Sequence, residues 1–124
     1  MAIETAIADA MELGYKKASE FGIKQGKRDL SSRNRDDVVC ELCALGFLYF
    51  GTFGEMPNNT TAYYDALVDK YPLLNVDIDN LDMSGQHTFR YLITYWNDAQ
   101  GRMMPEIIEE TRRLEAINME TDNG

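Results

Sequence analysis

Two cysteines, Cys40 and Cys43, stand three positions apart and are the clearest candidates for chemistry in the sequence. A redox dithiol needs one thiolate of lowered pKa, as occurs at the N-terminus of a helix. A zinc site needs four ligands, and the single histidine, His87, leaves such a site one ligand short even with both cysteines. No strand–helix–strand pattern surrounds the pair. We therefore interpret both cysteines as packing residues and expect no catalytic residue, no metal and no cofactor.

An acidic run near the middle of the chain has the composition of a calcium loop but not its spacing. A calcium-binding loop of the helix–loop–helix type needs oxygen ligands at positions 1, 3 and 5, a glycine at position 6 and a glutamate at position 12. Counted from Asp77, position 6 is Asp82 and position 12 is Thr88. The pattern therefore indicates a solvated acidic loop.

Charge is distributed unevenly along the chain, whose formal net charge is -9. Residues 1–36 hold seven bases and six acids, and residues 37–124 hold five bases and fifteen acids. Phosphate binding needs an excess of Lys and Arg, so this balance argues against direct binding of nucleic acid or of anionic membranes. We expect the acidic part to bind a protein partner with a basic, nucleic-acid-binding surface. The predicted partner-binding residues are Asp65, Asp69, Asp77, Asp79, Asp82, Glu106, Glu109 and Glu110.

A second candidate site combines the basic stretch over 24–35 with a turn over 97–102. Asn97 and Asp98 are typical turn residues whose side chains bond the local backbone, and Trp96 is expected to fill the core below them. Arg102 is placed to pair with Asp98. The alternative function is a small-ligand or nucleotide-binding module with a polar pocket beside the indole. Its predicted ligand-binding residues are Trp96, Asn97, Asp98, Arg102, Lys27 and Arg28.

Apolar residues at helical spacing predict helices over residues 2–21, 38–50, 60–70, 86–96 and 105–118. The segment 38–50 is apolar on all sides, which is typical of the buried centre of a small domain. For 86–96 a strand is the alternative, because the segment is rich in β-branched and aromatic residues.

Glycine and short polar residues mark the expected helix ends. Gly22 is positioned to end the first helix. The caps predicted for the next three helices are Asp36 or Asp37, Asn58 or Asn59, and Ser84.

The remaining segments are expected to be irregular. Residues 23–36 lack any period and predict a long basic loop. Residues 73–84 alternate apolar and acidic residues, but Asn and Asp are poor strand formers, so a loop is preferred to an edge strand. The fold class is therefore mainly α, a compact single domain over 1–118 of four to five helices with room for a minor β-hairpin. Residues 119–124 are expected to be a frayed tail.

Two stretches carry a resemblance to a known family. One is Val39-Cys40-Glu41-Leu42-Cys43-Ala44-Leu45-Gly46-Phe47-Leu48, and the other is Tyr95-Trp96-Asn97-Asp98-Ala99-Gln100-Gly101-Arg102. Together they resemble a family of small uncharacterised bacterial and phage-encoded proteins with a Cys-Ala-Leu-Gly core helix and a Trp-Asn-Asp-x-x-Gly-Arg turn. Met103 stands where that family usually has a threonine cap. The resemblance implies a mostly helical fold and no assigned reaction.

Location and function follow from these patterns. The longest apolar run, residues 44–50, is far shorter than the roughly 20 residues that span a membrane. The first residues include Glu4 and Asp9 and no basic stretch, so we expect no secretory signal and a cytoplasmic location. The sequence predicts a small acidic non-enzymatic regulator or inhibitor, plausible as a phage product, that binds a basic protein. The separation of charge also favours a homo-oligomer.

Overall fold

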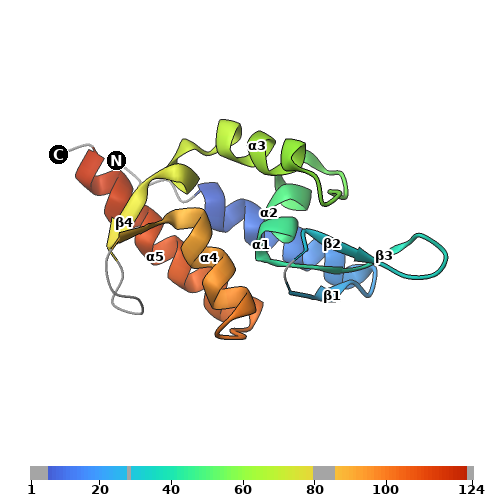
Figure 1. The fold of residues 1–124 in the computed structure, drawn as a ribbon. Coiled ribbons are helices and arrows are strands. Elements are labelled where there is room, and N and C mark those ends of the chain that lie inside the picture. Colours follow the sequence, from blue (N-terminus) through green and yellow to red (C-terminus); the bar gives the residue numbers. More distant parts are fainter. Residues whose placement is uncertain (1–5, 28, 80–85, 123–124) are drawn as a thin grey trace.

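The computed structural model describes residues 6–27, 29–79 and 86–122, and within them the chain is mainly helical (Figure 1). The helices are α1 (Ala6–Glu20), α2 (Ala44–Phe53), α3 (Thr61–Lys70), the 3-10 helix η1 (Pro72–Asn75), α4 (Phe89–Asp98) and α5 (Met104–Asp122). The strands are β1 (Lys24–Gln25), β2 (Ser31–Arg33), β3 (Val39–Leu42), β4 (Asp77–Asp79) and β5 (Gln86–Thr88). One hydrophobic core joins these elements, so the predicted mainly α, single-domain class is confirmed.

Helix α2 is the buried centre of the fold, as its apolar sequence predicts. All residues from 44 to 50 are buried. Helix α1 packs against it at backbone distance. A Cβ built on Gly14 would lie 1.9 Å from the Phe47 carbonyl oxygen, and one on Gly51 would lie 1.8 Å from the Ala10 carbonyl oxygen. No carbon fits at these distances, so the contact between the two helices requires both glycines.

Strands β1, β2 and β3 form a three-stranded sheet where the sequence predicts a loop followed by a helix. Strand β3 is central, with β1 parallel on one side and β2 antiparallel on the other. The predicted loop over 23–36 is therefore wrong in part, since it contains β1 and β2. The predicted helix over 38–50 begins six residues too early, because residues 39–42 are a strand and α2 starts at Ala44.

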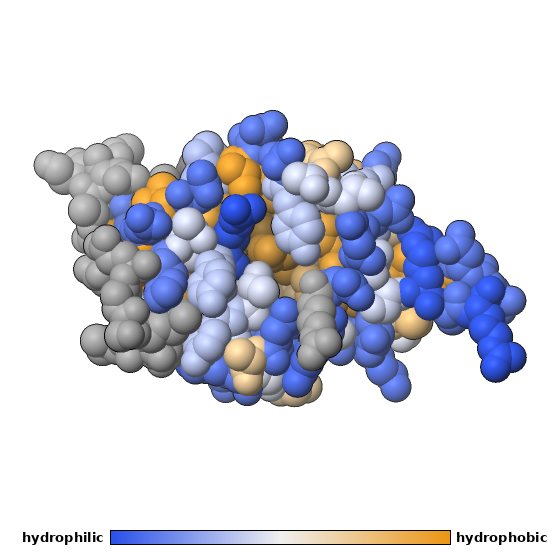
Figure 2. Space-filling view, viewed as in Figure 1, coloured by the Kyte–Doolittle hydropathy of each residue, from blue (hydrophilic) through white to orange (hydrophobic). Residues whose placement is uncertain are grey.

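The hairpin between β2 and β3 explains that error. Asn34 Oδ1 accepts hydrogen bonds from the N–H groups of Asp36 and Val38, which closes the turn. Asp37 has a φ of 62°, a left-handed conformation that Asp tolerates better than most residues. Neither Asp36 nor Asp37 caps α2, whose N-cap is Cys43. The hairpin projects from the body, and Figure 2 shows its end as strongly hydrophilic.

Helix α3 begins one residue later than the sequence predicts and ends where it predicts, but its predicted caps have other roles. Its N-cap is Thr60, which makes no side-chain capping bond. Asn59 instead pairs with both backbone groups of Ser31 on β2: its Oδ1 accepts from the Ser31 N–H at 3.0 Å and its Nδ2 donates to the Ser31 carbonyl at 2.8 Å. Asn58 accepts a hydrogen bond from Arg33 at 3.0 Å. Both predicted caps are therefore wrong, since these side chains hold β2.

The second sheet is the minor hairpin that the sequence allowed. Strands β4 and β5 are antiparallel, with Asp77 opposite Thr88 and the buried Ile78 opposite His87. The preference for a loop over residues 77–79 is wrong, since the alternation marks an edge strand anchored by its apolar residue. Strand β5 takes the first three residues of the predicted helix 86–96.

Helix α4 therefore starts later than expected, at Phe89. Thr88 is its N-cap, and its Oγ1 accepts a hydrogen bond from the Tyr91 N–H at 3.3 Å. The predicted cap Ser84 lies outside the described residues. Helix α5 starts at Met104, one residue before the prediction, and includes residues 119–122, which the sequence places in a tail. Gly22, with a φ of 75°, ends α1 as predicted.

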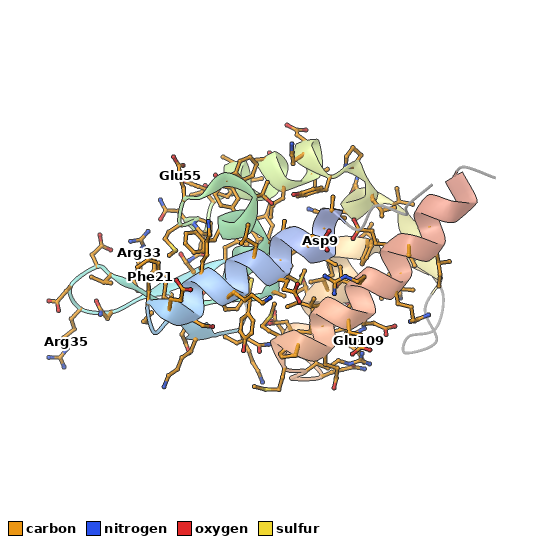
Figure 3. The ribbon with its side chains drawn as sticks, turned by 180° about the vertical axis from the view of Figure 1, so that it is seen from behind. Asp9, Phe21, Arg33, Arg35, Glu55 and Glu109 are labelled. Carbon is orange, nitrogen blue, oxygen red and sulfur yellow. The ribbon has the colours of Figure 1, made fainter. Side chains whose placement is uncertain are left out.

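The N-terminus of α1 is held by a side chain from the opposite end of the chain. Helices α1 and α5 lie side by side (Figure 3), and Glu115 of α5 is 3% exposed. Its two carboxylate oxygens accept hydrogen bonds from the N–H groups of Ile7 at 2.8 Å and Ala8 at 3.0 Å. Burial raises the pKa of Glu115 above its ordinary value, and the two N–H donors oppose that rise.

The raised pKa of Glu115 predicts a pH dependence of stability. The folded protein holds the Glu115 proton more tightly than the unfolded chain does, so this group's contribution is greatest below the ordinary carboxyl pKa and is lost as pH rises through the raised value. In urea unfolding between about pH 4.5 and 7, stability of the wild type should fall more than that of Glu115→Gln. Glu109→Gln, an exposed change on the same helix, is the control and should follow the wild type. Parallel curves for the wild type and Glu115→Gln would contradict this reading.

Candidate functional site

The turn after α4 contains a buried polar network centred on Asn97, which is 1% exposed. Asn97 Oδ1 accepts hydrogen bonds from the Ala44 N–H at 3.2 Å and from Gln25 Nε2 at 2.9 Å. Its Nδ2 donates to the Gly26 carbonyl at 2.9 Å and to Asp98 Oδ1 at 2.7 Å. The amide oxygen of Asn97 therefore accepts two hydrogen bonds and its amide nitrogen donates two. These bonds join β1, α2 and α4.

Gln25 extends this network to α5. Its Nε2 donates to the Arg102 carbonyl at 2.7 Å as well as to Asn97, and its Oε1 accepts from the Met104 N–H at 2.9 Å. Met104 is the first residue of α5, so Gln25 caps that helix from 79 positions away. Asn97 caps α2 in the same way, since the N-cap residue Cys43 offers no side-chain bond.

This geometry corrects the expected role of the turn. The Asn97 side chain, predicted to bond the local backbone, bonds the distant backbone groups of Ala44 and Gly26, so it caps a helix from across the fold. Sequence reasoning missed Gln25 entirely. The only available signal was the absence of a good local cap before α2 and α5, because Cys43 and Met103 cannot accept a hydrogen bond as Ser or Asp does.

The other predicted ligand residues lie around this network. Trp96 is 0% exposed and fills the core as predicted. The Arg102 guanidinium lies over its ring at 5.5 Å and pairs with Glu106 at 3.6 Å. Lys27 approaches the same turn, with its Nζ 3.6 Å from the Cβ position of Gly101. Arg28 lies outside the described residues. The basic stretch and the turn are thus neighbours, but the indole is covered.

The cysteine pair has the geometry of packing residues. Cys40 is in β3, and its Sγ donates to the Ser32 carbonyl at 3.4 Å. Cys43 stands at the N-terminus of α2, yet burial raises the pKa of its thiol to about 11 and outweighs the nearby backbone N–H groups. A cavity of about 10 Å³ borders Cys43, Tyr64 and Asn97, which is room for one water molecule at most.

The predicted acidic surface is divided between two sides of the fold. Asp65 and Asp69 are exposed, lie one turn apart on α3, and are followed by exposed Asp77 on β4. We call these three residues the acidic edge. Lys70 is the one base on α3 and β4, and no ion pair joins it or any other described base to the acidic edge. The Asp79 side chain and Asp82 lie outside what the structure describes.

The acids of α5 differ because arginines partly neutralise them. Glu106 pairs with Arg102, and Glu110 pairs with Arg113. Glu109 is exposed on the same helix (Figure 3). The predicted partner-binding side chains that the structure describes therefore fall into two groups, one on α3 and β4 and one on α5.

Two general features of the described ranges bear on function. No group of three or more His, Cys, Asp or Glu side chains among them is arranged to hold a metal ion. None of the described helices combines the length and the apolar character needed to cross a bilayer.

Comparison with protein-family models, with curated proteins and with solved structures finds no match.

The network predicts that Asn97 stabilises the fold far more than an ordinary polar residue. Asn97→Ala leaves the N–H of Ala44 and the carbonyl of Gly26 buried without their partner, which should cost about 2 to 4 kcal/mol. Asn58→Ala, which removes one exposed contact, should cost less than about 0.5 kcal/mol. Urea unfolding at neutral pH measures both. Equal losses in the two variants would show that the network is not a major source of stability.

Proposed function

We propose that the chain is a small acidic, non-enzymatic regulator that binds a basic protein through the acidic edge of Asp65, Asp69 and Asp77. The observation that carries this proposal is the exposure of three carboxylates, two on α3 and one on β4, that no described base neutralises. A surface of this kind attracts the same basic clefts that attract a phosphate backbone.

The placement of the three carboxylates supports the proposal. Asp65 and Asp69 are separated by one helical turn, about 6 Å along the axis of α3. Helix α3 leads through η1 directly into β4, so Asp77, the first residue of β4, continues the same stretch of chain (Figure 1). Because the side chains are exposed, they act on an approaching partner over roughly a Debye length.

The ion pairs of α5 explain why that helix is the weaker candidate. Glu106 and Glu110 would have to leave Arg102 and Arg113 before they could contact a new base. Surface pairs of this kind are worth at most about 1 kcal/mol, yet Arg102 and Arg113 offset the charge of two of the three carboxylates that a partner would meet. We therefore narrow the predicted partner-binding surface to the acidic edge.

The alternative of a nucleotide-binding module stays a prediction. Lys27 lies next to the turn at Gly101, which favours this alternative. The evidence against it is that Trp96 is buried and offers a ligand no stacking face, and that the cavity beside Asn97 is only about 10 Å³. Thermal stabilisation by a nucleotide would support the alternative.

A charge-matched pair of triple variants tests the proposal. The immobilised chain is incubated with the fraction of host proteins that a heparin column retains, and the proteins it binds are identified by mass spectrometry. We expect a discrete basic protein that binds at about 50 mM salt and is released at about 500 mM. Asp65→Asn/Asp69→Asn/Asp77→Asn should lose it, whereas Glu106→Gln/Glu109→Gln/Glu110→Gln should keep it.

The two triple variants change the net charge equally, so their comparison separates a specific edge from general acidity. Equal loss of the bound protein in both would contradict the acidic edge as the binding site. Binding that is indifferent to salt would contradict an electrostatic mode altogether.

A further inference from the structure

A large open hollow lies at the hairpin end of the molecule, apart from the acidic edge. Its volume is about 740 Å³, and it is bounded by the end of α1, the β2–β3 hairpin and the end of α2. Its apolar lining consists of Phe21, Ile23, Val38, Val39, Phe50 and Met56. Neither α3 nor β4 contributes to it, so whatever binds here is independent of the function proposed above.

The rim of this hollow exposes apolar side chains to water. Phe21 is 72% exposed and Val38 is 57% exposed, which places them among the most exposed large hydrophobic residues of the described chain. Single exposed hydrophobic residues are ordinary on a protein surface. Two of them beside the other apolar residues of the lining form the kind of patch through which proteins contact a partner. Figure 3 shows Phe21 at the same end as Arg33 and Arg35, with Glu55 on the neighbouring side.

Backbone groups at both sides of the three-stranded sheet already have partners within the chain. At Ser31 of β2 the Asn59 amide pairs with both backbone groups. On the other side of the sheet the Gly26 carbonyl, next to β1, is bonded to Asn97. Strand addition is therefore blocked at these two positions, and the apolar side chains of the hollow are the surface on which the proposal rests.

The charges beside the hollow are balanced, unlike those of the rest of the chain. The charged residues of its lining are Arg33 and Asp37, which form an ion pair at 3.9 Å, and Figure 3 shows Arg35 and Glu55 near the same end. Their sum is zero on a chain whose net charge is -9. Two copies of this chain repel each other over most of their surface, and this end is where they can approach without that cost.

We propose that the hollow is the interface for a second copy of this chain, in a symmetric dimer. A strongly acidic partner would meet Asp37 and Glu55, and a strongly basic one would meet Arg33 and Arg35. The rim carries both positive and negative charges around an apolar centre. In a symmetric dimer the second copy presents the same rim, rotated about a two-fold axis, so that unlike charges lie opposite one another. Homodimer interfaces are also the more apolar class.

A symmetric dimer would cover a small part of the accessible surface. A stable interface of ordinary size buries about 800 Å² on each partner. The whole chain has 7264 Å² of accessible surface, so the dimer would cover roughly a tenth of it. The Arg33 side chain is already held by the Asp37 carbonyl and by Asn58, so little ordering of the rim is needed.

Sedimentation equilibrium of the full chain at about 5 to 500 µM tests the proposal. We expect a monomer–dimer equilibrium for the wild type. Phe21→Ser and Val38→Ser should each raise the dissociation constant at least about tenfold, because each removes an apolar contact at the centre. Tyr91→Ser, which changes a side chain 50% exposed on α4 outside the hollow, should leave it within about twofold.

Far-ultraviolet circular dichroism checks that all three variants keep the wild-type fold, which we expect because the substituted side chains are exposed. A wild type that stays monomeric at the highest concentration would overturn the proposal and leave the hollow to a different partner. Equal effects of Phe21→Ser and Tyr91→Ser would overturn it as well, since the dimer would then use another face. Neither result bears on the acidic edge.

Discussion

The fold depends on side chains that cap helices from far along the chain. An α-helix begins with N–H groups that have no partner inside the helix, and burying them unpaired is costly. Here Glu115 serves α1, Asn97 serves α2 and Gln25 serves α5. Asn97 and Gln25 also bond each other, so the starts of two helices and the β1 strand share one network. These bonds join segments that are distant in sequence and fix how the helices meet.

The same constraint gives a physical reading to the two motifs on which the family resemblance rests. In the first, Gly46 lies where a Cβ would be 2.0 Å from the Leu30 carbonyl oxygen, so the chain before β2 can pass directly over α2. In the second, Trp96 fills the core, Asn97 caps α2, and Gly101 takes a φ of 63° so that the backbone can turn toward α5. Both motifs therefore have a structural role that is independent of any ligand.

Periodicity was enough to predict the helical class and the interior of each helix, because burial of an apolar face is a local property of the sequence. It was not enough to place the start of α2. The β-branched pair Val38-Val39 and the turn residues Asn34 to Asp37 favour a hairpin, yet the apolar run continues unbroken into the helix. The contacts at the candidate sites likewise include local ones, which spacing in the sequence indicates, and distant ones, which it does not. The i,i+4 spacing of Arg102 and Glu106 could have revealed their pair, whereas the contact of Arg112 with Asp9 across two helices could not.

Amide hydrogen exchange measured residue by residue tests the capping network most directly. In the wild type, the N–H groups of Ala44 and Met104 should be protected although each lies in the first turn of its helix. Replacing Gln25 with alanine should speed exchange at Met104 by at least about tenfold and leave Ile7 and Ala8, which Glu115 holds, unchanged. Unaltered protection at Met104, or a uniform loss at all these sites, would contradict the claim that remote side chains hold the helix starts individually.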